Sequence, residues 1–248
     1  MQHGRRTFCP LAARGPACAF PAGGRGQAPA SRTDRRGGHV RDGIRLAQPN
    51  WLQHQSGQAR GAPTTFADLL DPRWQGKIVK GNPDYSGTIF TATFALSRDL
   101  GWSYFERLAQ QKVVQVQSSR DPPNRLARGE SAVQADGARS ELLLLRERGA
   151  PVEVVYAGEG TPLIIAPSAV FKTAPSPNAA RLFQSFLFSI EAQQDLVDAY
   201  GMCSFHRLVK EKAGRRPLST IKLMKSDPEV MEAQREDIKA RYRSIFGS

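Results

Sequence analysis

The sequence predicts an α/β fold, and two patterns after residue 61 indicate it. Short runs rich in Val, Ile and Leu alternate with amphipathic segments of roughly ten residues. Many of these segments end at Gly, Pro or Asn, which are typical turn residues. Strands that alternate with helices in this way are typical of mainly parallel or mixed sheets with helices packed on them.

Composition divides the chain into two unequal parts. The 248 residues carry a net charge of +12, but residues 1–60 hold ten Arg, no Lys and two Asp, which is +8 of that total. The rest of the chain is nearly balanced at +4, and 40% of all residues are hydrophobic. One large domain or two small lobes can be built from this length. No apolar run approaches the ~20 residues that span a bilayer, so no membrane insertion is expected.

Residues 1–61 are predicted to be a disordered basic segment that is out of frame. The start of the chain has the look of a targeting segment, but Arg14, Gly15 and Pro16 interrupt its apolar stretch. Arg without Lys, among many Gly, Ala and Pro, is what GC-rich DNA encodes in a wrong frame. Read one base later, the codons for residues 51–60 permit the string GYNTNLVKPE. A genuine disordered basic tail is the alternative.

Caps and turns set the expected elements of the ordered part. Thr64–Thr65 with Asp68 predicts a short helix start, and Pro72 ends it. The next expected elements are a strand at 77–80, a helix opened by residues 86–88, a helix at 102–110 and a strand at 113–116. Then come a helix that follows residues 118–123 and ends at Gly129, a strand at 131–135, a helix at 139–148 and strands at 152–156 and 163–165. The last are a helix capped by Asn178 and running through Phe188, a helix at 190–200 ended by Gly201, and two weak tail helices, one over 228–246.

Several strings in the ordered part occur in the order of a known family. The first is TFADLLDPRWQGKI at 65–78, followed by NPDYSG at 82–87, LARGE at 126–130, GAPVE at 149–153, EGTP at 159–162, APSPNAARLF at 174–183 and LFSIEAQ at 187–193. Over residues 62–247 the chain resembles the type 2 periplasmic solute-binding proteins of ABC importers, in the group of ferric-iron, polyamine and phosphonate receptors. The one-base-shifted string GYNTNLVKPE resembles the segment that precedes APTTF in this family.

The resemblance implies a two-lobed fold in which the first lobe is incomplete. Lobe two is expected over 62–160, and 161–248 is expected to be the returning half of lobe one with C-terminal helices. The implied protein is a periplasmic receptor that captures a small polar or anionic solute, or a metal complex, between its lobes. Its implied partners are that solute and an ABC permease, and it is expected to be a monomer without cofactor. Closure would use a hinge near residues 159–162.

The strongest candidate binding segment is Asp84, Tyr85, Ser86, Gly87 and Thr88, at a strand-to-helix turn. A helix N-terminus presents unpaired N–H groups and about half a positive charge, which suits an oxyanion. The two hydroxyls add donors, and the glycine lets a ligand approach the backbone. The alternative is that Ser86 only caps the helix. Because receptors of the family place ligands at this turn, the resemblance favours binding.

Three further candidates lie after later strands. Ser119 and Arg120 belong to a loop at a strand end, where open α/β sheets bind ligands, and Arg120 could grip an anion with two hydrogen bonds. The alternative for Arg120 is a solvated surface residue. Asp136 could meet an ammonium group or could simply form a turn before Gly137.

Neither a metal site nor an active site is predicted. Iron receptors of this group place two adjacent tyrosines in the later segment, whereas Tyr200 stands next to Ala199 and Gly201 here. The nucleophile elbow, phosphate loop, zinc-protease and dinucleotide fingerprints are absent from the sequence. A non-enzymatic receptor is therefore the first hypothesis, and no nucleic-acid partner is expected with it. A nucleic-acid-binding protein with an arginine-rich arm and an enzyme on the same lobed fold are the alternatives.

Overall fold

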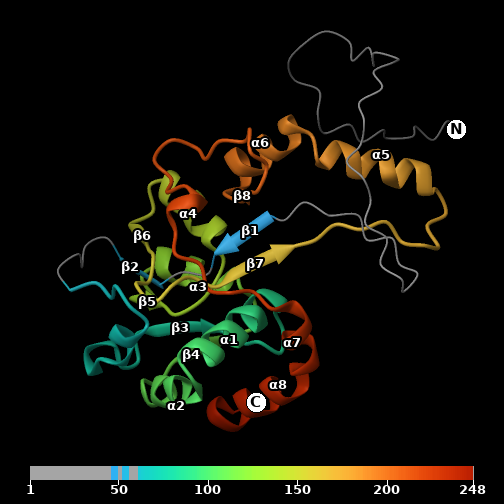
Figure 1. Cartoon of the computed structure of the whole chain (residues 1–248). Helices are drawn as coiled ribbons and strands as arrows, with labels where there is room; N and C mark the ends of the chain where they lie inside the picture. Colours follow the sequence, from blue (N-terminus) through green and yellow to red (C-terminus); the bar gives the residue numbers. More distant parts are fainter. Residues whose placement is uncertain (1–45, 50–51, 56–60, 248) are drawn as a thin grey trace, which may run out of the picture. The chain divides into compact units, whose positions relative to one another are not determined.

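The computed structural model describes residues 61–247 and, ahead of them, the backbone of the segments 46–49 and 52–55. The expected alternation is present: helices pack on a mixed five-stranded sheet and on a second, three-stranded sheet (Figure 1). Among the described residues no helix is both long and apolar enough to cross a membrane. The predicted α/β class is confirmed.

The five-stranded sheet is the centre of the first half of the fold. Its order is β4-β3-β5-β2-β6. It is formed by β2 (Leu52–Gln55), β3 (Ile78–Gly81), β4 (Val114–Val116), β5 (Val133–Gln134) and β6 (Val152–Val155). β3 pairs in parallel with both β4 and β5, whereas β2 pairs antiparallel with β5 and β6. The loops that follow these three parallel strands therefore lie at one edge of the sheet.

The three-stranded sheet is antiparallel and has the order β7-β1-β8. β1 (Leu46–Pro49) lies between β7 (Leu163–Ala166) and β8 (Cys203–Ser204). β1 and β2 lie in the segment for which the sequence predicted no regular structure, so the structure differs from that expectation at 46–49 and 52–55. Both strands find their partners far along the chain, and such long-range pairing leaves no local signal. The remainder of residues 1–60 lies outside the described part, and the frame hypothesis stays a prediction.

Most predicted helices appear with nearly the predicted bounds. Those of the first half are α1 (Gly87–Asp99), α2 (Trp102–Gln110), α3 (Asp121–Ala127) and α4 (Arg139–Glu147), and those of the second half are α5 (Pro177–Leu187), α6 (Ile190–Tyr200), α7 (Pro228–Ala233) and α8 (Arg235–Phe246). Three short 3₁₀ turns, η2 (Ala67–Leu70), η3 (Pro72–Trp74) and η4 (Leu218–Thr220), complete the described elements.

Three expectations about helix ends are corrected. The segment after Pro63 forms only the 3₁₀ turn η2, because the Asp68 carboxylate accepts hydrogen bonds from the Thr64 and Thr65 N–H groups and closes a tight turn. α5 begins at Pro177 with Ser176 as its N-cap, two residues before the predicted cap Asn178. The tail forms two helices, α7 and α8, where one was predicted over 228–246.

The hydrophobic core lies around the five-stranded sheet. One cluster joins Phe66, Leu69, Phe105 and Leu108 to Ile78 and Val133 on the strands. A second cluster packs Val79 of β3 and Val152 of β6 with Leu126 of α3 and with Leu142 and Leu143 of α4. Each cluster also contains a residue that is distant in the sequence. Met224 belongs to the first cluster and Ile221 to the second.

The C-terminal tail also packs on this first half of the fold. Ile238 of α8 is buried against Phe90 and Phe94 of α1. α8 lies beside α1 and α2, with Tyr242 fully buried (Figure 1). The sequence assigned 161–248 to one lobe, but residues 221–246 contribute to the core built by 66–157. The lobe boundary at residue 160 itself stays a prediction.

Candidate functional site

The candidate site is the edge of the five-stranded sheet at which β4, β3 and β5 end. The Asn82 N–H donates to the Val116 carbonyl (2.8 Å), which joins the loop after β3 to the end of β4. The Ala138 N–H donates to the Ser119 carbonyl (3.1 Å), which joins the loop after β5 to the loop after β4. The loops that hold the predicted site residues are thus neighbours, as expected where parallel strands end.

The turn after β3 has the predicted form of a capped helix start. Ser86 is the N-cap of α1, with an extended backbone (φ −136°, ψ 117°), and its Oγ accepts a hydrogen bond from the Ile89 N–H (3.4 Å). Gly87 is the first helical residue, and a Cβ on it would meet nothing within 4 Å. Tyr85 is 65% exposed just before the cap. Glycine thus leaves open space at the first turn of α1, where the helix dipole favours an anion.

Ser119 and Arg120 lie on the neighbouring loop after β4. The Arg120 side chain is 76% exposed, and its Nε lies 3.1 Å from Glu141 Oε1 of α4. The Arg120 N–H is held by Ser118 Oγ (3.1 Å), and its carbonyl accepts from the Asn124 side chain. The backbone is therefore fixed, whereas the guanidinium is open to solvent and weakly held, since exposed ion pairs contribute little.

Asp136 is placed differently from the prediction. It is 1% exposed, and its Oδ2 lies 2.6 Å from Nζ of Lys80, which is equally buried. Its other oxygen accepts the Gly81 N–H (2.8 Å), and Lys80 donates to the Gly81 carbonyl (3.0 Å). Burial raises the pKa of Asp136 and lowers that of Lys80, while their mutual attraction opposes both shifts. The Asp136 carboxylate therefore holds the end of β3 through the Gly81 N–H, and it is already paired with the Lys80 cation.

The tail helix α8 supplies cations that the sequence reasoning missed. Arg243 Nη1 lies 3.0 Å from Asp84 Oδ1, and Lys239 Nζ lies 4.0 Å from the same oxygen. Asp84 is thereby held between two basic side chains that follow it by more than 150 residues. Their i, i+4 spacing on one helix was the only available signal, and nothing local connects it to Asp84.

The ring of Tyr242 links this tail helix to the buried pair. Lys80 Nζ lies 4.8 Å from the centroid of the Tyr242 ring, and the Tyr242 hydroxyl donates to Gln115 Oε1 of β4 (2.9 Å). Burial raises the pKa of the Tyr242 hydroxyl, so it stays a proton donor. α8 therefore braces β3 and β4 at the edge that releases the candidate loops.

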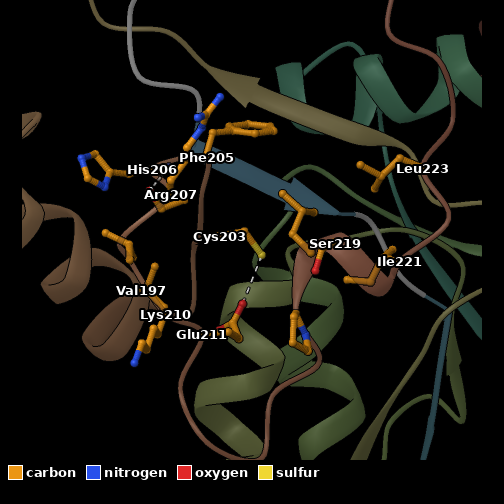
Figure 2. A pocket seen from close by; sticks show the side chains of 14 residues that line it. Val197, Cys203, Phe205, His206, Arg207, Lys210, Glu211, Ser219, Ile221 and Leu223 are labelled. Atoms are coloured by element: carbon orange, nitrogen blue, oxygen red, sulfur yellow. Dashed lines mark hydrogen bonds between the residues drawn. The ribbon is translucent and has the colours of Figure 1, made fainter.

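A pocket of about 530 Å³ lies elsewhere, between α6, β8 and the segment 205–223 (Figure 2). Cys203 and Glu211 face each other in it, with Sγ donating to Oε2 (3.5 Å). Beneath them Arg139 Nη1 donates to the same sulfur (2.9 Å), and burial raises the pKa of the Cys203 thiol to about 12. None of the eight predicted residues lines this pocket. We place the candidate site at the sheet edge instead, because Cys203 and Glu211 in this pocket are already engaged with Arg139 and with each other.

Metal ligands do not gather in the described part of the chain, where no three His, Cys, Asp or Glu side chains lie together as a metal ion would need. The sheet edge instead offers hydroxyls, backbone N–H groups and cations, and its carboxylates, Asp84, Asp136 and Glu141, are each paired with a basic side chain. This chemistry suits an oxyanion better than a metal ion.

Comparison with known proteins agrees with the fold. A structure of the periplasmic binding protein AfuA from Actinobacillus pleuropneumoniae, with exogenous fructose-6-phosphate bound, superposes with a TM-score of 0.74 at 24% identity. The match covers 82% of this chain and 67% of AfuA. Iron-bound HitA from Pseudomonas aeruginosa matches with a TM-score of 0.69 at 20% identity over 82% of this chain and 68% of HitA. The shared architecture is the type 2 periplasmic binding fold.

Sequence comparison identifies the family. An uncharacterized protein of Haemophilus influenzae is 28% identical over 136 residues, which are 53% of this chain and 39% of that protein. The chain thus matches about two fifths of the length of this curated relative. The family described as Bacterial extracellular solute-binding protein matches residues 38–202, which is well over half of the chain. This match begins at residue 38, whereas the resemblance of the motifs begins only at residue 62. The chain therefore belongs to the bacterial extracellular solute-binding protein family.

Proposed function

We propose that this protein is the extracytoplasmic solute-binding component of an ABC importer, which captures a small anionic solute and presents it to its permease. The family assignment supports the receptor role. Relatives of the same fold were solved with fructose-6-phosphate and with iron, and another is a thiamin-binding protein. The proposal includes delivery to the periplasm and a non-enzymatic role, and the same family assignment supports both.

One observation carries the ligand class. The N-terminus of α1 opens at the same sheet edge as the exposed Arg120, so two groups that attract anions lie on adjacent loops. A phosphate or carboxylate can accept N–H bonds from the first turn of α1 and a guanidinium bond from Arg120. The basic side chains Lys239 and Arg243 of α8 add positive potential near Asp84. Asp136 contributes by holding the end of β3 and is not proposed to touch the ligand.

The experiment is a ligand titration of the purified protein by calorimetry. Fructose 6-phosphate is the anionic probe, and thiamin, spermidine and ferric citrate are the competing classes. Arg120→Gln should weaken binding of the phosphate about tenfold, which is the loss of one charge-assisted interaction of roughly 1.4 kcal/mol. Thermal stability should stay within about 0.5 kcal/mol, because the side chain is exposed.

Arg128→Gln is the matched control. Arg128 is also an exposed arginine paired with a carboxylate, Glu130, but it lies at the C-terminal end of α3. It should leave the affinity unchanged. Equal loss in both variants would mean that general positive charge attracts the probe, and binding of spermidine or iron alone would overturn the anionic assignment.

The nucleic-acid alternative finds no support. The matching family is one of solute-binding proteins. The similar structures named above are a periplasmic binding protein and the iron-bound HitA. The basic excess lies in residues 1–60, while the rest of the chain carries a net charge of only +4. A duplex-DNA titration at about 150 mM salt tests the basic residues 1–60 directly: binding that weakens steeply with added salt would favour the alternative, and no shift would count against it.

A further inference from the structure

A carboxylate stands at the entrance to the helix start where an anion is proposed to bind. Asp84 lies two residues before Ser86, the N-cap of α1, and its N–H donates to Asn82 Oδ1 (2.9 Å). The Asn82 N–H is bonded in turn to the Val116 carbonyl at the end of β4 (2.8 Å). The carboxylate is therefore held close to the first turn of α1. A negative charge fixed there would repel an anionic ligand and compete for the positive end of the helix dipole.

The C-terminal helix α8 brings two cations to this carboxylate. Asp84 Oδ1 lies 3.0 Å from Arg243 Nη1 and 4.0 Å from Lys239 Nζ. The Asp84 and Lys239 side chains are 19% and 20% exposed, and that of Arg243 is 42% exposed. Solvent screens such partly shielded charges less than it screens fully exposed ones. The three side chains, called the Asp84 cluster below, carry a net charge of +1.

Packing fixes α8 between its two cations, so their positions are determined by the fold. Tyr242 is fully buried, and its hydroxyl donates to Gln115 Oε1 of β4 (2.9 Å). Gln115 Nε2 donates to the Phe246 carbonyl at the end of α8 (3.0 Å). Since residues four apart share one face of a helix, Lys239 and Arg243 both reach the loop before α1.

We propose that Arg243 and Lys239 are positioning residues for the ligand, which act by outweighing the charge of Asp84. The role rests on the anionic ligand proposed above. Without the two cations, Asp84 would turn the approach to α1 from attractive to repulsive for an anion. Binding should therefore follow the summed charge of the Asp84 cluster and not the presence of its ion pair.

The test is calorimetric titration of the full chain with fructose 6-phosphate. Asp84→Asn raises the charge of the cluster and should strengthen binding about threefold, whereas Arg243→Gln lowers it and should weaken binding about threefold. Asp84→Asn/Arg243→Gln has no ion pair but restores the original charge, so its affinity should return to within about a factor of two of wild type. Raising the salt to about 0.5 M should shrink all of these differences.

Arg241→Gln is the matched control. Arg241 is also an arginine of α8 near a carboxylate, but its Nη2 lies 3.9 Å from Glu106 of α2. This variant lowers the net charge of the protein by the same amount as Arg243→Gln and should leave the affinity unchanged. Thermal unfolding of each variant checks that it is folded. If Arg243→Gln does not fold, Lys239→Gln with Asp84→Asn/Lys239→Gln makes the same comparison.

The outcomes separate this role from the proposed function. If the wild-type chain binds no fructose 6-phosphate and no other anion, the anionic ligand class fails and the role of α8 fails with it. If the wild type binds but the double variant stays as weak as Arg243→Gln, the ion pair acts through loop geometry and the charge role is wrong. Equal weakening by Arg241→Gln would also overturn it, because any cation on the helix would then serve.

Discussion

At the scale of single residues, glycine positions show where the backbone leaves no room for a side chain. Gly201 ends α6 in the left-handed conformation (φ +66°), as its place in the sequence predicted. A Cβ there would lie 3.0 Å from the Ser140 carbonyl oxygen and 3.1 Å from the Ser140 Cα. Its own carbonyl accepts a hydrogen bond from the buried Arg139 (3.2 Å). The sequence indicated the left-handed cap, but only the structure shows the close approach to α4.

Gly201→Ala should therefore cost about 2–3 kcal/mol of unfolding free energy, through left-handed strain and the contact with Ser140 together. Gly149→Ala is the control, because Gly149 also has a positive φ (+88°) but open space around its missing Cβ. It should cost only about 1 kcal/mol. Urea denaturation of the three proteins measures the difference. Equal costs would mean that backbone strain alone decides the effect.

The buried ion pair marks the limit of residue-level prediction at the site. Ser86, Gly87, Ser119 and Arg120 follow strand ends, so their placement at one sheet edge could be inferred from the alternating pattern. Asp136 follows a strand end too, but its environment depends on Lys80, 56 positions earlier. Lysine in a strand normally indicates a solvent-facing side. Here the strand is buried along its whole length, and no sequence period records that.

At the scale of elements, local signals found the helices and missed the strands at 46–49 and 52–55. Ser86, Ser189 and Asp227 each cap a helix with a side-chain bond, and such caps are visible in sequence. β2 instead depends on backbone bonds to β5 and β6, about 80 to 100 residues away. The docking of α8 against α1 and α2 is non-local in the same way. Elements fixed by caps could be predicted, and elements fixed by distant pairing could not.

Removing one partner of the Lys80–Asp136 pair should destabilise the sheet edge strongly. Lys80→Met leaves a buried carboxylate without its cation, and we expect a loss of about 3–5 kcal/mol in chemical denaturation. Lys80→Met/Asp136→Asn should recover a large part of that loss, because no net charge stays buried and an amide oxygen can still accept the Gly81 N–H. If the double variant is no more stable than the single one, packing of the lysine stem is the main contribution.

At the scale of the whole molecule, the core is unevenly distributed. Residues 66–157 and the tail 221–246 build the described clusters, whereas 163–208 contribute to none of them. Polar contacts made by Arg215 help to join α6 to α4 of the first half. Arg215, with a fully buried side chain, donates to the Val197 carbonyl and to the Asp198 carbonyl (3.1 Å), which ties it to α6. The same guanidinium lies 2.6 Å from Glu147 Oε1 of α4.

Because Arg215 joins α6 to the Glu147 carboxylate of α4, the stability of this contact should depend on pH. The hydrogen bonds from Arg215 and Lys212 lower the pKa of Glu147 from 4.5 to about 2. A depressed carboxylate pKa stabilises the fold above the unfolded pKa of 4.5, and this contribution is lost as the pH falls from 4.5 through about 2. Glu147→Gln should therefore lower the unfolding free energy by about 1–2 kcal/mol at pH 7, where a buried arginine loses its anion.

The difference between wild type and Glu147→Gln should shrink steadily between pH 4.5 and 2, as the wild-type carboxyl takes up its proton. Denaturant titrations at several pH values measure this directly. Glu153→Gln serves as the comparison, because it removes a more exposed ion pair, between Glu153 of β6 and Arg146 of α4 (3.1 Å). It should change stability by less than about 0.5 kcal/mol. A constant Glu147→Gln penalty down to pH 2 would show that the ion pair contributes through geometry and not through charge.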